Sequence, residues 1–163
     1  MTSNSALSDQ RSNTLVIGIG NPLCSDDGLG VHVASLLCER ELPPGVQIAE
    51  LGTPGWGLVN HLADGQRVIL IDAVEMGLEP GTWRRLAADD IGLIAGDSSV
   101  SLHEPGLAES LALAQALDLL PEEFVLYGVE PACTDPGLAL SPEVGEAIPV
   151  LMENILGEIW KTT

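Results

Sequence analysis

The sequence predicts an α/β fold, a three-layer sandwich with a mostly parallel central sheet of about five strands flanked by helices on both faces. Two observations support this prediction. Continuous apolar runs, such as residues 68–71 and 124–129, are typical of strands that are covered on both faces. These runs alternate along the chain with segments of helical periodicity, which is the pattern of parallel strands joined by right-handed crossovers.

The length of the chain, 163 residues with 45% hydrophobic, fits a single domain with a sizeable core. Residues 1–13 are mostly polar and are expected to form a flexible N-terminal tail, which leaves residues 14–163 as one α/β domain. No apolar run approaches the roughly 20 residues that a membrane span needs. The N-terminal residues also lack an apolar signal core, so we expect the protein to stay in the cell.

Charge and cysteine content narrow the classes of function. The chain carries 24 Asp and Glu against 6 Lys and Arg, a formal net charge of -18, which disfavours nucleic acid and anionic membrane surfaces as partners. The negative charge is compatible with binding of a cation or of a basic polypeptide segment. The three cysteines, Cys24, Cys38 and Cys133, include no C-x-x-C pair. We therefore expect neither a cysteine zinc knuckle nor a disulfide framework, and we expect a cytoplasmic location.

Residues 15–30, which read LVIGIGNPLCSDDGLG, are the stretch around which the chain is organised. An apolar strand runs into a loop where Gly18 and Gly20 permit a sharp turn, and a helix packed on one face begins near Leu29. The loop carries Asn21 and Asp27. Because ligands bind beyond the carboxyl ends of strands in open parallel sheets, this loop is a candidate site.

Two other interpretations of this loop are possible. Ser25, Asp26 and Asp27 are residue types that cap a helix and occupy its first turn, because carboxylates accept the free backbone N–H groups there. Capping is therefore as reasonable as a binding site. A dinucleotide-binding loop is disfavoured, since the third glycine of G-x-G-x-x-G would fall on Leu23 and no phosphate-loop lysine follows.

Periodicity and turn residues predict the remaining elements. Residues 67–74 contain the apolar run of a central strand, and residues 82–86 fit an antiparallel edge strand. Pro149 is expected to kink the last helix or to divide it. The other expected elements are strands at 46–51 and 124–129, and helices at 56–62, from Leu107 onward, and from Pro142, with Ser141 as its N-cap, to the end of the chain.

Asp72 and His103 are further candidate site residues. Asp72 is expected at the end of the central strand, where an ionised carboxylate needs a hydrogen-bond, ionic or metal partner. Alternatively, Asp72 has a purely structural role and its carboxylate accepts hydrogen bonds from the backbone N–H groups of a neighbouring loop. His103 precedes a helix in the same layer as the other strand ends. His32 and His61 fall within helices and are expected to be surface or partly packed side chains.

Asp27, Asp72 and His103 are far apart in the sequence, but each is expected at the same rim of the sheet. Two carboxylates and one imidazole suit a divalent ion such as nickel or zinc, with positions left open for water or substrate. Such an ion could polarise a carbonyl group and activate a water molecule. Without a metal, Asp27 and Asp72 could share a proton as an acid/base pair. The residues alone leave both possibilities open.

Several segments of the chain resemble a known family. The segments GIGNPLCSDDGLG, IDA with its continuation EMGLEPG, SLHEPGL and GVEP look like those of the hydrogenase maturation endopeptidases, in the same order. The resemblance extends from about Leu15 to about Trp160. The opening pattern G-x-G-N-x-x-x-x-D-[DE]-x-x-G is quite specific when it is joined to the other segments. The chain is therefore similar to this family over nearly its full length.

The resemblance implies an endopeptidase that removes the C-terminal extension of a nickel-iron hydrogenase large-subunit precursor after nickel insertion. It also implies that Asp27, Asp72 and His103 bind the nickel that the precursor carries and serve the cleavage reaction. Two alternatives stay open, a non-catalytic nickel-binding chaperone and a protease of similar fold that acts on another protein. The residues expected to contact the substrate are Asn21, Gly52 and Thr53.

Overall fold

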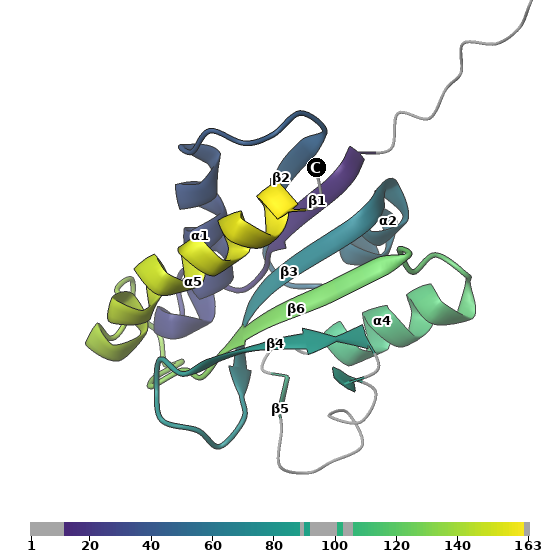
Figure 1. Cartoon of the computed structure of the whole chain (residues 1–163). Helices are drawn as coiled ribbons and strands as arrows, with labels where there is room; N and C mark the ends of the chain where they lie inside the picture. The colour runs from purple at the N-terminus through teal and green to yellow at the C-terminus, as the bar shows by residue number, and fades with distance from the viewer. Residues whose placement is uncertain (1–11, 89, 92–100, 103–105, 162–163) are drawn as a thin grey trace, which may run out of the picture.

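The computed structural model describes residues 12–88, 90–91, 101–102 and 106–161. Residues 1–11 of the expected tail and His103 lie outside the described residues. The elements in chain order, drawn in Figure 1, are β1 (Ser12–Gly18), η1 (Ser25–Gly28), α1 (Leu29–Cys38), β2 (Val46–Glu50), α2 (Trp56–Asp64), β3 (Gly65–Glu75), β4 (Trp83–Ala87), β5 (Ser101–Leu102), α4 (Leu107–Ala116), β6 (Glu123–Val129) and α5 (Pro142–Lys161).

The sheet has the strand order β2-β1-β3-β6-β4, with β5 paired to β3 beside this path. β1 pairs in parallel with β2 and β3, and β3 pairs in parallel with β6. β4 pairs antiparallel with β6 at the edge of the sheet, so the prediction of an antiparallel edge strand at residues 82–86 is confirmed. The α/β class and the mostly parallel sheet are also confirmed.

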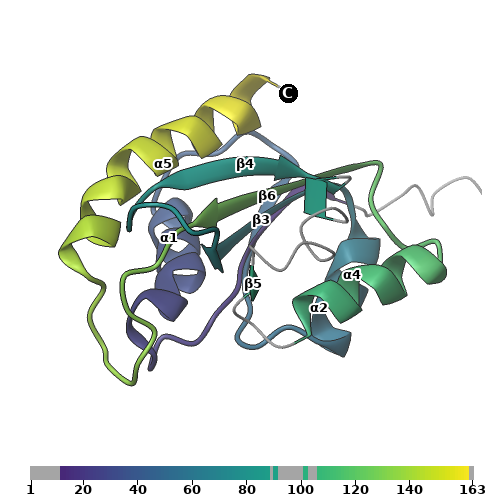
Figure 2. The same cartoon turned by 90° about the horizontal axis from the view of Figure 1, so that it is seen from below.

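Helices pack against both faces of this sheet (Figure 2). Alternation along the central strand β3 divides its side chains between the two faces. Ile69 and Ile71 belong to a buried cluster with α1 and α5, whereas Val68 and Leu70 belong to a second cluster with α2 and α4. The continuous apolar run of β3 is thus explained by burial on both faces. Among the described residues, no helix is long and apolar enough to cross a membrane.

The last helix, α5, runs without a break from Pro142 to Lys161 and contains Pro149 in its interior. Division of the helix at this proline was the wrong alternative. Proline removes one helical hydrogen bond, but the buried side chains of Ile148 and Leu151 lie on either side of it and pack against the sheet. Tertiary packing therefore keeps the helix in one piece.

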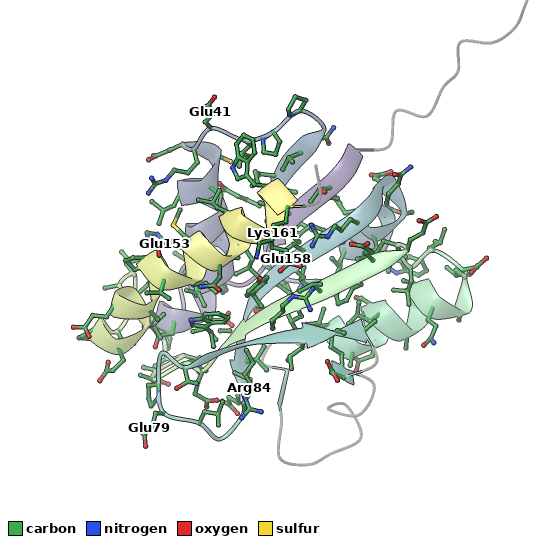
Figure 3. All side chains as sticks on the ribbon, in the orientation of Figure 1. Glu41, Glu79, Arg84, Glu153, Glu158 and Lys161 are labelled. Atoms are coloured by element: carbon green, nitrogen blue, oxygen red, sulfur yellow. The ribbon has the colours of Figure 1, made fainter. Side chains whose placement is uncertain are left out.

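A charged network joins α5 to three strands through Glu158, which Figure 3 labels. Arg67 of β3 contacts Glu158 Oε1 with Nη2 at 2.5 Å, and Arg85 of β4 donates to the same carboxylate at 2.8 and 3.0 Å. The hydroxyl of Tyr127 in β6 also donates to it. Burial raises the pKa of Glu158, but the hydrogen bonds from Arg85 and Tyr127 outweigh this effect and set the pKa below its usual 4.5.

We expect a Glu158→Gln variant to lose about 1–3 kcal/mol of unfolding free energy at pH 7, because the buried Arg67 would lose one of its two anionic partners and keep only Glu123. Because the folded state lowers the pKa of the Glu158 carboxyl, the ionised carboxylate stabilises the fold at pH values above the ordinary pKa of 4.5. This stabilisation is lost as the pH falls below that value and the carboxylate takes up a proton. The difference in unfolding free energy between the variant and the wild type should therefore become smaller as the pH is lowered from 6 to about 3. Urea titrations across this range measure it. Glu153→Gln, at an exposed position of the same helix, is the matched control and should show little change.

Candidate functional site

The loop between β1 and α1 folds closely onto the sheet because glycines allow its backbone to touch neighbouring backbone. Gly20 has φ +123°, and a Cβ at this position would lie 1.8 Å from the carbonyl oxygen of Asp27. A Cβ at Gly30 would lie 2.2 Å from the carbonyl oxygen of Ile71 in β3. Only residues without a side chain permit such approaches. The glycines therefore fix η1, and Asp27 with it, against β3, which η1 contacts.

Asp27 lies in η1 and is only 6% exposed. Its Oδ2 accepts a hydrogen bond of 3.0 Å from the backbone N–H of Asn21. The side-chain Oδ1 of Asn21 in turn accepts a bond of 3.0 Å from the backbone N–H of Leu23. The loop thus orients the Asp27 carboxylate through its own backbone.

Asp72 lies inside β3 and not at its end, where it was expected. The strand continues to Glu75 because its last part pairs with β6 and β5. Ile71 is the β3 partner of Gly18, the last residue of β1, so Asp72 is the first β3 residue beyond the end of β1. Asp72 is fully buried. The structure therefore brings Asp27 and Asp72 to the same edge of the sheet.

Asp26 has a structural role that the sequence patterns did not indicate. Asp26 and Asp27 do lie in the first turn of the short helix η1, but the N-cap of α1 is Gly28 and no side chain caps either helix. The expected capping by these side chains was therefore wrong. Asp26 is fully buried and holds the loop that follows β6. Its carboxylate accepts hydrogen bonds from Ala132 N (2.9 Å), Cys133 N (3.1 Å), Ser141 N (2.7 Å) and Ser141 Oγ (2.8 Å).

The residues expected to contact the substrate lie in two loops at this same edge. The carbonyl oxygen of Gly52, in the loop after β2, accepts a hydrogen bond of 3.2 Å from the N–H of Gly20. Gly52 and Thr53 are exposed, and Asn21 is half-buried. The two loops are therefore joined directly, and their exposed residues surround the edge where Asp27 lies.

The chain on both sides of His103 belongs to the same edge, although His103 itself lies outside the described residues. Leu102 pairs with Val74 near the end of β3. On the other side, a Cβ at Gly106 would lie 3.9 Å from the carbonyl oxygen of Pro54, in the loop after β2. Within the described part of the chain, no three His, Cys, Asp or Glu side chains gather into a metal site. The expected nickel-binding group includes His103, which is not among those residues.

Glu130 is a further buried carboxylate at the end of a strand, only 7% exposed. Its Oε2 accepts hydrogen bonds from the backbone N–H groups of Met76 at 2.6 Å and Leu78 at 3.2 Å. Glu130 therefore ties the segment after β3 to the end of β6. A signal for it exists in the sequence, because Glu130 directly follows the apolar strand 124–129 much as Asp72 follows its own apolar run.

A family model described as hydrogenase maturation protease (HycI) matches residues 31–158. The chain belongs to the hydrogenase maturation protease family. Asp72 and His103 lie inside the matched range, and Asp27 lies just before it. The prediction of this family from the sequence segments is therefore confirmed.

Individual members of the hydrogenase maturation protease family show the same relationship. The chain is 41% identical over 121 residues to the hydrogenase expression/formation protein HupM of Azotobacter chroococcum, an alignment of 74% of this chain and 58% of that protein. It is 37% identical to HupD of Bradyrhizobium diazoefficiens, over 86% of this chain and 74% of that protein. The chain thus spans less than two thirds of the length of the first of these relatives.

The fold also matches a solved member of this family. The structure of the hydrogenase maturating endopeptidase HybD from E. coli superimposes with a TM-score of 0.81 at 31% sequence identity. The alignment covers 92% of this chain and 93% of that one. The arrangement of strands and helices described above is therefore the fold of a hydrogenase maturation protease.

The tight contact at Gly30 predicts a large effect on the stability of this chain. A Gly30→Ala variant should lose about 3 kcal/mol or more of unfolding free energy, because its Cβ would meet backbone atoms of β3 that cannot move aside. Chemical denaturation measures the loss. Gly157→Ala is the matched control, since a Cβ at Gly157 meets nothing within 4 Å. That variant should gain about 0.5–1 kcal/mol from helix propensity, and equal stabilities of the two variants would contradict the packing described here.

Proposed function

We propose that the protein is an endopeptidase that removes the C-terminal extension of a nickel-iron hydrogenase large-subunit precursor after nickel has been inserted. Membership of the hydrogenase maturation protease family supports an endopeptidase acting on such a precursor. The observation that carries the proposal is the placement of two buried carboxylates, Asp27 and Asp72, at one edge of the sheet. Exposed residues of the neighbouring loops, Gly52 and Thr53 among them, lie at the same edge.

In this proposal, Asp27, Asp72 and His103 recognise the nickel ion that the precursor carries, so the ion arrives as part of the substrate. Carboxylate and imidazole groups are donors that divalent first-row metals accept. The residues on either side of His103 lie beside β3 and the loop after β2, which supports its inclusion. Three ligands without a thiolate should hold free metal less firmly than a closed structural site does. Only a nickel-loaded precursor would then dock productively.

The cleavage itself is hydrolysis of one peptide bond. A metal ion next to that bond would polarise its carbonyl group or hold the bond in a fixed position. One of the two carboxylates, Asp27 or Asp72, then accepts a proton from the attacking water and returns it to the leaving amine. Burial of both side chains excludes bulk water from this transfer and strengthens their electrostatic effect.

The setting of the proposed reaction is the cytoplasm. Cys24, Cys38 and Cys133 are all free thiols in the structure, as expected for a protein that works in a reducing compartment. The partner is the hydrogenase large-subunit precursor. The formal charge of -18 argues against nucleic acid and anionic membranes as additional partners.

A direct test compares the purified protein with two forms of the precursor, one loaded with nickel and one free of metal. Intact-mass spectrometry should show loss of a C-terminal fragment only from the nickel-loaded form. Binding of the nickel-loaded precursor without any loss of mass would favour a nickel-binding chaperone. Cleavage of the metal-free form at the same rate would remove nickel recognition from the proposal. Failure to cleave either form would favour a protease for another protein.

A further inference from the structure

A groove with a volume of about 220 Å³ opens beside the candidate site. Four segments that are distant in sequence form it: the loop of residues 22–28, the first turns of α1, the end of β2 and the loop after β6. Pro22, Val31 and Leu138 supply apolar wall, and Glu50 and His32 supply polar groups. The loop of residues 22–28 also carries Asp27 of the candidate site, between the groove-lining residues Ser25 and Gly28.

The apolar wall of the groove is held in a fixed position. Leu138 is 84% exposed, and its loop is hydrogen-bonded to the loop of residues 22–28. The N–H of Gly137 donates to the carbonyl oxygen of Leu23 at 2.9 Å, and the N–H of Ser25 donates to the carbonyl oxygen of Gly137 at 2.8 Å. The buried carboxylate of Asp26 ties the same loops together. The large apolar side chain of Leu138 is thus presented to solvent by a loop that several hydrogen bonds hold in place.

The size and charge of the groove indicate a polypeptide as its occupant. Small-molecule pockets usually enclose about 300–1,000 Å³, whereas about 220 Å³ accommodates only one or two side chains. Glu50 is exposed at the rim of the groove, directly before the loop that carries Gly52 and Thr53. In a chain of formal charge -18, this carboxylate favours a basic side chain in the partner through electrostatic complementarity.

We propose that this groove binds an extended segment of the precursor next to the cleaved bond, with an apolar side chain against Leu138 and Val31 and a Lys or Arg facing Glu50. This inference rests on the proposed function, because it takes the precursor as the partner. It adds a specificity surface outside the nickel-binding residues. Docking on two surfaces, the metal and the groove, would select a precursor that has both the ion and the correct neighbouring sequence.

Binding and cleavage are measured separately to test the groove. The dissociation constant for fluorescently labelled, nickel-loaded precursor is determined by anisotropy, and kcat and KM are determined by mass spectrometry. Leu138→Asp and Glu50→Lys should each raise the dissociation constant and KM at least tenfold, with little change in kcat. The matched controls are Leu117→Asp, after the far end of α4, and Glu41→Lys, beyond the end of α1; both positions are exposed. Both controls should behave like the wild type.

A photo-crosslinking amino acid at position 138 then identifies the occupant. We expect crosslinks to precursor residues close to the cleavage site, within a segment that contains Lys or Arg, and none from position 117. Unchanged precursor binding by Leu138→Asp, no precursor binding by the wild type, or crosslinks only to a second copy of this chain would each overturn the groove proposal. Precursor binding that depends on Leu138 but leads to no cleavage would support the groove and would refute the endopeptidase proposal instead.

Discussion

An Asp72→Asn variant is expected to cleave the nickel-loaded precursor at least about a hundredfold more slowly than the wild-type protein. Asparagine has nearly the same size, so the fully buried position in β3 stays packed. It carries no negative charge for the metal and cannot move a proton during hydrolysis. Single-turnover experiments followed by intact-mass spectrometry measure the rate without interference from product release.

The matched control for this variant is Asp64→Asn, which makes the same change at an exposed position at the end of α2. This control should cleave at the wild-type rate. Urea unfolding of both variants checks that the fold is intact. An Asp72→Asn protein that folds normally and cleaves within twofold of the wild-type rate would remove Asp72 from the proposed site.

Replacement of Asp26 by asparagine should have the largest effect on stability among the acidic residues. The Asp26 carboxylate accepts four hydrogen bonds, three of them from backbone N–H groups of Ala132, Cys133 and Ser141. An amide of the same size would turn one acceptor atom into a donor that faces these donors. With Asp26 fully buried, we expect a loss of about 3–5 kcal/mol of unfolding free energy.

Guanidinium unfolding measures this loss, with Asp135→Asn as the control. Asp135 is exposed and lies in the same loop, so its replacement should change the unfolding free energy by about 0.5 kcal/mol or less. Because the Asp26 bonds also support Leu138, the Asp26→Asn variant should bind the precursor more weakly as well. A loss of less than 1 kcal/mol would show that the loop after β6 is held by other contacts.

Much of the fold could be predicted from local sequence patterns. The apolar run of β3 is long enough to indicate burial on both faces, and the structure places it at the centre of the sheet. The edge strand β4 is shorter and more polar, and it does pair antiparallel at the edge. These predictions succeeded because burial on one or two faces leaves a direct periodic trace in the sequence.

Long-range contacts could not be predicted in the same way. The pair Asp26 and Asp27 looks like a helix start, and local capping rules gave no reason to separate the two. In the structure they point to different partners, since Asp26 bonds residues of the loop after β6, and Asp27 bonds the N–H of Asn21. Pro149 likewise signals a break that tertiary packing of α5 prevents. Local propensity is overridden where buried contacts are strong.

Only part of the geometry of the candidate site could be predicted, namely the part that depends on the topology of the sheet. Parallel strands end at the same edge of a sheet, which is why Asp27 and Asp72 could be expected together. The exact position of Asp72 within β3 was not predicted, because it depends on how far β6 and β5 extend beyond β1. The close approach of Gly30 to Ile71 could be suspected only from the density of glycines in the loop.

X-ray absorption spectroscopy at the nickel edge tests most directly whether Asp27, Asp72 and His103 coordinate the nickel ion that the precursor carries. Spectra are taken of the nickel-loaded precursor alone and of its complex with the protein, frozen before turnover. We predict additional oxygen and nitrogen ligands at nickel in the complex, with fewer of them in complexes of the Asp72→Asn and His103→Ala variants. A nickel environment that is the same in the free precursor and in the wild-type complex would contradict recognition of the metal by these residues.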